Sequence, residues 1–316
     1  MSGRTLQLAR TERTPARPGP GAMPLALLRG VELTIRRRID GMLVGDHRAA
    51  ALGDGTELAQ VRPYQLGDDV RLIDWNVTAR TTEPHVRVHL AERVLVTWIV
   101  LDTTPSMAFG TADRRKADVA LGATLAIGHA ATLRGNRVGL VGFGGDGVRV
   151  VPPRQGRAGL VGLLLALRDG HEPSDAPMRN GSGPSPLAEA LRQLAGIARQ
   201  RALVVIVSDF RGDRDWRRPL LQVAGRHEVV AFEVRDPREQ QLEPAGTLFL
   251  VDPETGRELR VDTSDARLRA RFAEAAAEER AVVARELASA GVAHVALTTD
   301  RDWLRDLAVF VRRRRA

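Results

Sequence analysis

Short apolar runs alternate with longer amphipathic segments along the chain after residue 92. The runs are rich in Val, Ile and Leu without polar alternation, which is typical of strands buried on both faces of a sheet. Strands that alternate with helices favour parallel pairing through crossover connections, so the pattern predicts an α/β fold with a doubly wound, mostly parallel sheet. Its strands are expected at 94–101, 137–143, 202–207, 228–234 and 292–298, and its helices near 115–134, 156–168, 186–199, 213–225, 264–290 and 301–313.

Two tracts have the composition of β-hairpin turns. The residues Gly144-Gly145-Asp146-Gly147 separate two apolar runs, which predicts an antiparallel edge strand at 148–151. The tract from Asp252 to Gly256 lies between the runs 247–251 and 257–261 and predicts a second hairpin.

The pattern changes near residue 92. Residues 61–93 read VRPYQLGDDVRLIDWNVTARTTEPHVRVHLAER, with a Gly-Asp-Asp turn, few helical periods and an alternating tract. These features predict a small strand-rich module. We therefore expect a disordered tail over 1–24, this module over 25–92 with a short helix near its start, and the α/β domain over 93–316.

The composition is that of a globular protein with ample core, at 43% apolar and 27% charged residues. The longest apolar runs are far shorter than the ~18–20 residues that cross a bilayer, so no membrane span is expected. The first twenty residues have no apolar core before a small-residue cleavage site, which favours a cytoplasmic protein. The absence of cysteine excludes disulfides, thiolate metal sites and cysteine nucleophiles.

The net charge of +8 is carried almost wholly by arginine, because Lys116 is the only lysine. Arginine binds phosphate and carboxylate groups in a planar, bidentate manner, which is compatible with nucleic acid or acidic partners. The arginines are scattered, however, and no aromatic residues interleave with them as a base-stacking surface requires. Nucleic acid is therefore not the expected partner.

The apolar run from Val94 to Leu101 ends in Asp102, and the hydroxyl residues Thr104 and Ser106 follow two and four places further on. Open α/β sheets bind ligands outside the carboxyl ends of their strands. One carboxylate and two hydroxyls suit Mg²⁺, which prefers oxygen ligands and keeps several waters. The same residues also have the composition of a strand-ending turn with an N-cap, and this fragment alone leaves both interpretations open.

A second strand end has the same design. The run 202–207 is followed by Ser208 and Asp209, and if this strand neighbours 94–101 where the sheet reverses direction, Asp102 and Asp209 face one crevice. Ser185 stands just before the helix that leads to this second strand. It is either a further hydroxyl of the crevice or a plain helix N-cap.

Asp102-Thr103-Thr104-Pro105-Ser106, Ser185 and Asp209 resemble the metal-ion-dependent adhesion site of von Willebrand factor type A domains, whose first motif is D-x-S/T-x-S. The stretch 61–95 is more specifically similar to the bacterial domain-of-unknown-function family 58 (DUF58), whose members carry such a domain. It covers 61–95 almost continuously, and the adhesion-site pattern extends the match to about residue 210.

The resemblance implies a metal site at the strand ends. Thr104 and Ser106 would bind Mg²⁺ (or Mn²⁺) directly, Asp102 and Asp209 would act largely through waters, and an acidic side chain of a partner would complete the octahedron.

The resemblance also implies partners, and the chain departs from the family pattern in two ways. The family's genes commonly accompany AAA+ ATPases of the MoxR class, which implies such an ATPase as a partner alongside an acidic client protein. The third hydroxyl is usually threonine, whereas here it is Ser185, with Ser182 as a rival. Many relatives carry membrane helices that this chain lacks, which implies a soluble form.

The main enzymatic alternative is a metal-dependent hydrolase acting on phosphate esters, with Asp102 and Asp209 holding the ion and its water. No G-x-S-x-G elbow or P-loop motif occurs, and no histidine is spaced to activate Ser106 or Ser208. We therefore predict a non-enzymatic, metal-dependent protein-binding adaptor or co-chaperone that works with a MoxR-type ATPase.

The small module contains a second group of carboxylates that could be mistaken for a catalytic or metal site. Ion-pair networks gather such residues as well, so we interpret them as structural pairs that fix the module onto the α/β domain. The residues concerned are Asp68, Asp69 and Asp74 with the interleaved Arg62, Arg71 and Arg80.

Overall fold

The computed structural model describes residues 52–90, 95–111, 114–132, 135–144, 147–169, 184–251 and 258–313. Contacts divide them into two compact units, one within Val44–Val94 and one that begins at Leu95. The division falls close to the change of pattern near residue 92. The expected tail and the helix expected after it lie outside the described residues.

The small unit is built on an antiparallel strand pair, β1 (Leu52–Pro63) and β2 (His85–Leu90). A 3₁₀ turn, η1 (Val70–Leu72), and a helix, α2 (Trp75–Thr81), lie between the two strands. The helix was not expected in a strand-rich module. Asp74 caps it by accepting hydrogen bonds from the amides of Asn76 and Val77, and its few turns are too short to give a helical period.

The predicted ion pairs of the small unit are correct only in part. Arg62 binds Asp68 at 2.7 Å, but Asp74 is paired with Arg87 at 2.9 Å rather than with a nearer arginine. Asp69 instead accepts a hydrogen bond from the backbone amide of Arg71, and Arg80 Nε donates to the carbonyl of Asn76. The pair with Arg87 was missed because it depends on the antiparallel return of β2.

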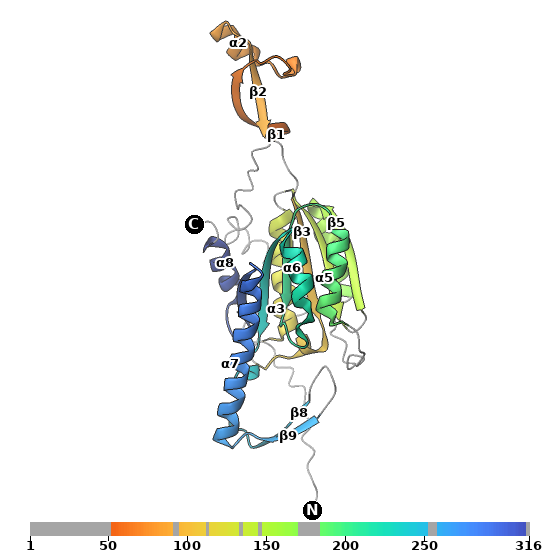
Figure 1. Cartoon of the computed structure of the whole chain (residues 1–316), viewed down its shortest axis with the longest axis vertical. Coiled ribbons are helices and arrows are strands. Elements are labelled where there is room, and N and C mark those ends of the chain that lie inside the picture. The colour runs from red at the N-terminus through yellow and green to blue at the C-terminus, as the bar shows by residue number, and fades with distance from the viewer. Residues whose placement is uncertain are drawn as a thin grey trace, which may run out of the picture. The chain divides into compact units, whose positions relative to one another are not determined.

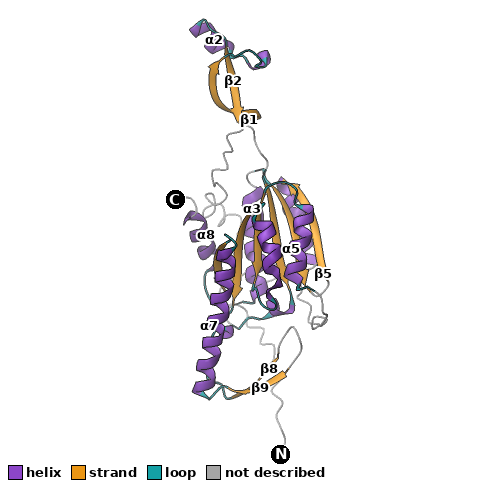
Figure 2. Ribbon diagram, in the orientation of Figure 1, coloured by secondary structure: helices purple, strands orange, loops and turns teal. Residues whose placement is uncertain are grey.

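The larger unit contains a six-stranded sheet in the order β10-β7-β6-β3-β4-β5, in which only β5 runs antiparallel to its neighbour (Figures 1 and 2). The predicted doubly wound, mostly parallel sheet is therefore confirmed. The strands are β3 (Val96–Thr103), β4 (Arg137–Gly144), β5 (Gly147–Gln155), β6 (Ala202–Ser208), β7 (Glu228–Arg235) and β10 (Ala293–Thr298).

Both predicted hairpins are present. β5 pairs with β4 along the edge of the sheet, and it extends further than the expected 148–151. The second hairpin consists of β8 (Thr247–Val251) and β9 (Glu258–Asp262), which form a separate two-stranded ribbon.

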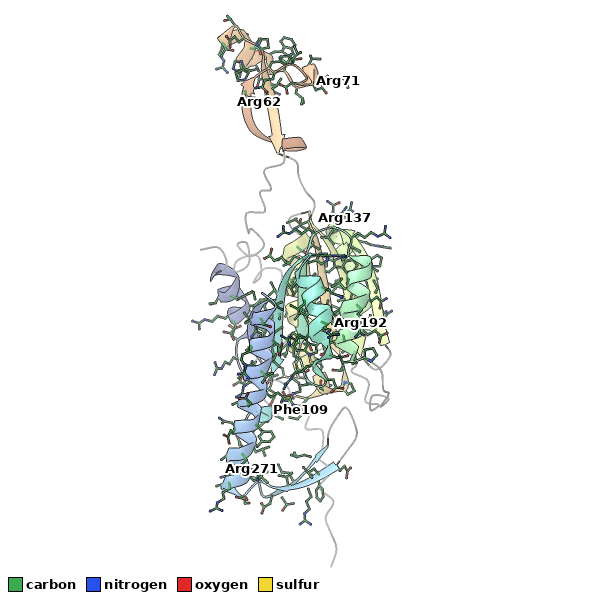
Figure 3. All side chains as sticks on the ribbon, viewed as in Figure 1. Arg62, Arg71, Phe109, Arg137, Arg192 and Arg271 are labelled. Carbon is green, nitrogen blue, oxygen red and sulfur yellow. The ribbon has the colours of Figure 1, made fainter. Side chains whose placement is uncertain are left out.

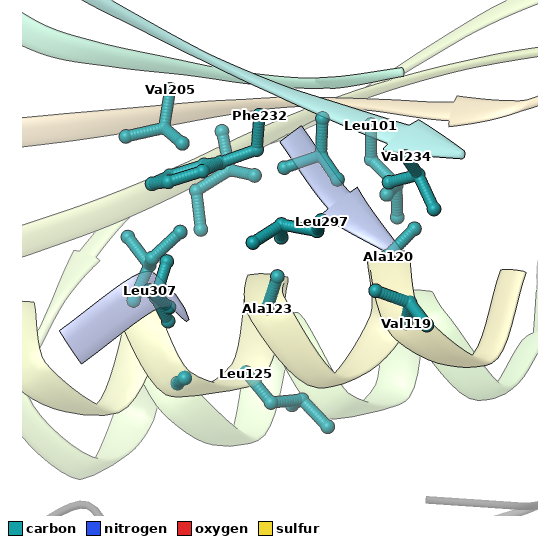
Figure 4. Close-up of a cluster of buried hydrophobic side chains, with 14 of the residues drawn as sticks. Leu101, Val119, Ala120, Ala123, Leu125, Val205, Phe232, Val234, Leu297 and Leu307 are labelled. Atoms are coloured by element: carbon teal, nitrogen blue, oxygen red, sulfur yellow. The ribbon is translucent and has the colours of Figure 1, made fainter. Parts of the chain in front are cut away.

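The two faces of the sheet carry separate apolar cores, because successive residues of a strand point to opposite faces. Ile99 and Leu101 of β3 belong to one core, with α3, α4 and α8, and part of this core is drawn in Figure 4. Trp98 and Val100 belong to the other core, with α5, α6 and α7. The helices are α3 (Lys116–Thr132), α4 (Gly156–Asp169), α5 (Pro186–Ile197), α6 (Arg217–Ala224), α7 (Ala266–Ser289) and α8 (Trp303–Arg313).

Among the described residues, no helix combines the length and the apolar character needed to cross a membrane.

Candidate functional site

The two predicted strand ends lie side by side. β3 pairs in parallel with β6 on one side and with β4 on the other, so the sheet reverses its winding direction at β3. Asp102 occupies the carboxyl end of β3, and Asp209 directly follows β6. This is the switch point at which open α/β sheets bind ligands.

Four buried side chains at this edge form one chain of hydrogen bonds. The hydroxyl and the amide of Thr104 both donate to Asp102 Oδ1, at 2.6 and 2.9 Å. The hydroxyls of Thr104 and Ser106 lie 3.0 Å apart, and Ser106 Oγ donates to Asp209 Oδ2 at 2.7 Å. The structure thus brings together Asp102, Thr104, Ser106 and Asp209, which we call the switch-point cluster.

The turn after β6 is held in a rare backbone conformation. Phe210 has a φ of 54°, in the left-handed region that non-glycine residues seldom adopt. Its amide donates to Ser208 Oγ at 3.0 Å, and its ring packs edge-on against Trp216. Ser208 Oγ also donates to Asp102 Oδ2, so the turn ties Asp102 to the end of β6. Such backbone strain is often found at functional sites.

A buried ammonium group adjoins the switch-point cluster. Lys116, the first residue of α3, is 0% exposed, and its Nζ lies 2.7 Å from Asp209 Oδ2 and 2.7 Å from Glu239 Oε1. Glu239 ends η4 (Pro237–Glu239), the 3₁₀ turn after β7. The Nε of Arg211 lies 3.6 Å from the same Glu239 oxygen.

The two aspartates of the cluster have opposite electrostatic environments. Burial and the neighbouring Asp209 carboxylate raise the pKa of Asp102 to about 7. Burial would also raise the pKa of Asp209, but the charge and hydrogen bond of Lys116 outweigh it and hold that pKa below its usual range. Burial likewise opposes the charge on Lys116, but Asp209 and Glu239 outweigh it and raise the pKa of the ammonium. Near neutral pH, Asp209 and Lys116 are therefore charged, while Asp102 titrates.

The raised pKa of Asp102 predicts a pH dependence of stability in metal-free buffer. A carboxyl whose pKa is higher in the folded chain than in the unfolded chain favours folding at low pH, and this contribution is lost as pH rises through the folded-state value of about 7. We expect the free energy of unfolding of the wild type, relative to Asp102→Asn, to fall between about pH 4, near the unfolded-state pKa, and about pH 7, and to level off above that. Urea denaturation of both proteins at a series of pH values measures this difference. A difference that does not vary with pH would contradict the prediction.

The hydrogen bonds of Ser185 are made with residues outside the switch-point cluster. It caps α5 by accepting from the amide of Ala188, and both its amide and its hydroxyl donate to Asp215. The structure thus gives Ser185 the N-cap role that the sequence left open. Its role as a third hydroxyl ligand stays a prediction, and the rival Ser182 lies outside the described residues.

A small open cavity lies beside Asp209. Its walls come from the ends of β6 and β7, the turn that carries Glu239, and one face of α7. Two polar atoms of these walls are buried, Arg280 Nη1 and Gln240 Oε1. Neither has a hydrogen-bond partner within the described part of the chain. Burial and the nearby Arg235 lower the pKa of Arg280, while Glu233 and Glu279 in the same walls act against this shift.

Other arginines of the larger unit are dispersed. Arg137, Arg192 and Arg271 are exposed and lie at separate places in Figure 3. These three form no common stripe of the kind that tracks a nucleic acid backbone.

The switch-point cluster suits a hard divalent cation. Its carboxylate and hydroxyl oxygens lie within hydrogen-bond distance of one another, and oxygen atoms are the ligands that Mg²⁺ prefers. Burial and Asp209 raise the pKa of Asp102, and a bound cation would favour its ionised form. No group of three or more His, Cys, Asp or Glu side chains that could hold a metal occurs in the described ranges, so the hydroxyls would be necessary ligands.

Lys116 and Glu239 were missed as site residues by sequence reasoning. Lys116 was identifiable as the only lysine of the chain, but no spacing pattern connects it with residues about a hundred positions away. Glu239 was identifiable from the Asp236-Pro237-Arg238-Glu239 tract, which forms a capping box directly after β7.

A doubly wound sheet with a D-x-T-x-S cluster at its switch point defines a von Willebrand factor type A-like domain. The model of the family "Protein of unknown function DUF58" matches residues 60–282, and the chain belongs to this family. Its relatives include uncharacterized proteins of Mycobacterium bovis and Mycobacterium tuberculosis, each 43% identical over 292 residues, which is 92% of this chain and 89% of the relative.

Similar solved structures share little sequence with this chain. The conserved hypothetical protein BatB from Bacteroides thetaiotaomicron has a TM-score of 0.43 at 14% identity, over 70% of this chain and 98% of that chain. A von Willebrand factor type A protein from Catenulispora acidiphila has a TM-score of 0.37 at 16% identity, over 72% of this chain and 43% of that chain.

Proposed function

We propose that this protein is a non-enzymatic adaptor or co-chaperone that uses Mg²⁺ or Mn²⁺ at the switch-point cluster to bind an acidic side chain of a partner. The observation that carries the proposal is the convergence of Asp102, Thr104, Ser106 and Asp209 in one buried chain of hydrogen bonds. Thr104 and Ser106 would hold the ion with their hydroxyls, and the two aspartates would hold its waters.

The charge balance of the site supports a carboxylate as the partner's ligand. Lys116 already neutralises part of the charge of Asp209, so the cluster offers less negative charge than two free carboxylates would. A bound ion would therefore stay electron-poor and attract an additional carboxylate.

A MoxR-type AAA+ ATPase is the partner that we propose. This step depends on the family, because DUF58 genes commonly accompany such ATPases. The metal would link the adaptor to an acidic residue of the ATPase or of a client protein, and any ATP chemistry would belong to the ATPase.

The test is capture of the purified MoxR-type ATPase of the same organism on immobilised protein, with Mg²⁺ or with chelator. We expect capture to require the metal and to be lost in Asp102→Ala, because the cluster then loses one of its two carboxylates. The matched control is Asp262→Ala, an exposed aspartate on β9, which should capture normally. Capture by Asp102→Ala at the wild-type level would refute the metal mechanism, provided that circular dichroism shows an intact fold.

One observation favours a second function, metal-dependent hydrolysis of phosphate esters. A carboxyl whose pKa lies at about 7 is suited to general base catalysis at neutral pH, and Asp102 has such a pKa. Turnover of generic phosphoesters with Mn²⁺, abolished in Asp209→Ala, would favour the hydrolase over the adaptor.

A further inference from the structure

The most unusual feature beside the switch-point cluster is the buried side chain of Lys116. Of the 47 lysine and arginine residues in the chain, Lys116 is the only lysine, and it is fully buried with ion pairs to Asp209 and Glu239. A buried ammonium is costly unless it is paired and hydrogen-bonded, so this position is occupied for its charge and not for packing alone.

The geometry explains why lysine rather than arginine stands here. An ammonium is a compact point charge with three donors, whereas a guanidinium is a wide planar fork. The Nζ of Lys116 reaches Asp209 Oδ2, the same oxygen that accepts the hydroxyl of Ser106. The ammonium therefore acts on a carboxylate oxygen that belongs to the proposed metal site.

Glu239 gives the ammonium a second acceptor outside the cluster. It lies at the same 2.7 Å distance as Asp209, and it comes from the turn after β7 rather than from the strand ends that form the cluster. A small movement of Nζ away from Asp209 would release charge on Asp209, and the contact with Glu239 would keep the ammonium paired.

We infer that Lys116 is a built-in counter-ion that sets the metal affinity of the switch-point cluster by sharing Asp209 with a hard divalent cation, and that Glu239 takes up the ammonium when the metal binds. This inference rests on the metal site of the proposed function, and it assigns Lys116 and Glu239 as affinity-determining residues. Lys116 weakens metal binding because two cations repel each other across one carboxylate. Glu239 strengthens metal binding because it draws the ammonium away.

The test compares Mn²⁺ affinity of the full chain in two variants by titration calorimetry. Lys116→Met removes the competing charge at similar length, and we expect it to bind Mn²⁺ about tenfold or more tightly than the wild type. Glu239→Gln keeps the shape and an acceptor oxygen but leaves Asp209 as the only carboxylate partner of the ammonium, so we expect binding several-fold weaker. Arg211→Met is the control, because it removes a cation that lies 3.6 Å from Glu239 and is 39% exposed. It should change affinity about twofold at most, since exposed charges are well screened.

The opposite signs separate this inference from a purely structural role of Lys116. If Lys116 only held the fold together, both variants would weaken binding, and this result would overturn the inference. It would also be overturned if Lys116→Met bound Mn²⁺ no more tightly than the wild type, including the case in which neither binds the metal. If the wild type binds no Mn²⁺ but Lys116→Met does, the result would support the inference.

A second measurement tests the inference about Lys116 if Lys116→Met does not fold. Because Lys116 is the only lysine, protein labelled with [¹³C]lysine and carrying a lysine-free tag gives one side-chain Cε signal by NMR. We expect this signal to shift on saturation with Mg²⁺, and an unchanged signal at saturation would overturn the inference. Metal-independent capture of the ATPase would refute the proposed function while leaving both of these results valid.

Discussion

Asp209→Asn is expected to lower the free energy of unfolding by about 3 kcal/mol in metal-free buffer, because removing one partner of a buried ion pair leaves the other uncompensated. One oxygen of Asp209 accepts from both Ser106 and Lys116, and the other accepts from the amide of Arg211. An asparagine has a single side-chain oxygen, so it cannot accept from Ser106 and Lys116 on one side and from the Arg211 amide on the other. Glu239 still pairs with the ammonium, which keeps the loss near the lower end of the range for such pairs. Differential scanning calorimetry should show a Tm lower by roughly 5–10 °C.

Asp102→Asn is the matched control, since it makes the same chemical change on the neighbouring strand. Oδ1 of Asp102 accepts both donors of Thr104, and an asparagine oxygen can replace it there. Oδ2 accepts from the hydroxyl of Ser208, and an asparagine NH₂ at that position can donate to the same hydroxyl once it reorients. This carboxyl has a raised pKa, so its ionisation disfavours the folded state at high pH. We expect Asp102→Asn to be at least as stable as the wild type near pH 8. Equal destabilisation by the two substitutions would show that Lys116 does not distinguish the two aspartates.

The sheet could be predicted from the sequence because its strands are buried on both faces. A strand such as β3 needs apolar residues at every position, and the resulting run is visible without knowledge of its neighbours. The small unit was harder to predict, because α2 is defined by its caps and not by periodicity. The pairing of Asp74 with Arg87 arises only when β2 returns alongside β1.

The site could be predicted only as far as the strand ends define it. Parallel neighbours bring their carboxyl ends together, which was enough to place Asp102 and Asp209 in one crevice. The contacts of Lys116 could not be predicted, because they depend on how α3 packs after the turn that carries Ser106. The sequence also could not decide the role of Ser185, since a helix N-cap and a ligand hydroxyl require the same residue types.

Asp236 is a further residue that the sequence did not indicate, and its hydrogen bonds connect three loops at the edge of the sheet. It is fully buried at the end of β7. Oδ1 accepts from the hydroxyl of Thr111 at 2.6 Å and the amide of Arg238 at 2.9 Å. Oδ2 accepts from the amide of Thr111 at 2.9 Å and the hydroxyl of Thr299 at 2.7 Å. Its carboxylate therefore connects the loop before α3, the turn that carries Glu239, and the end of β10.

Asp236→Asn is expected to destabilise the fold by about 3 kcal/mol, because each buried donor left unsatisfied costs about 1–3 kcal/mol. Either orientation of an asparagine amide places its NH₂ group against a backbone amide, that of Thr111 or that of Arg238, and two donors then face each other. The control is Thr299→Val, which removes one hydroxyl donor and should cost about 1 kcal/mol. Urea denaturation gives both values, and hydrogen exchange should show faster exchange of the Thr111 amide in Asp236→Asn. If the two substitutions cost the same, Asp236 contributes one ordinary hydrogen bond, and the position of Lys116 and Glu239 relative to the cluster must be fixed by the apolar core instead.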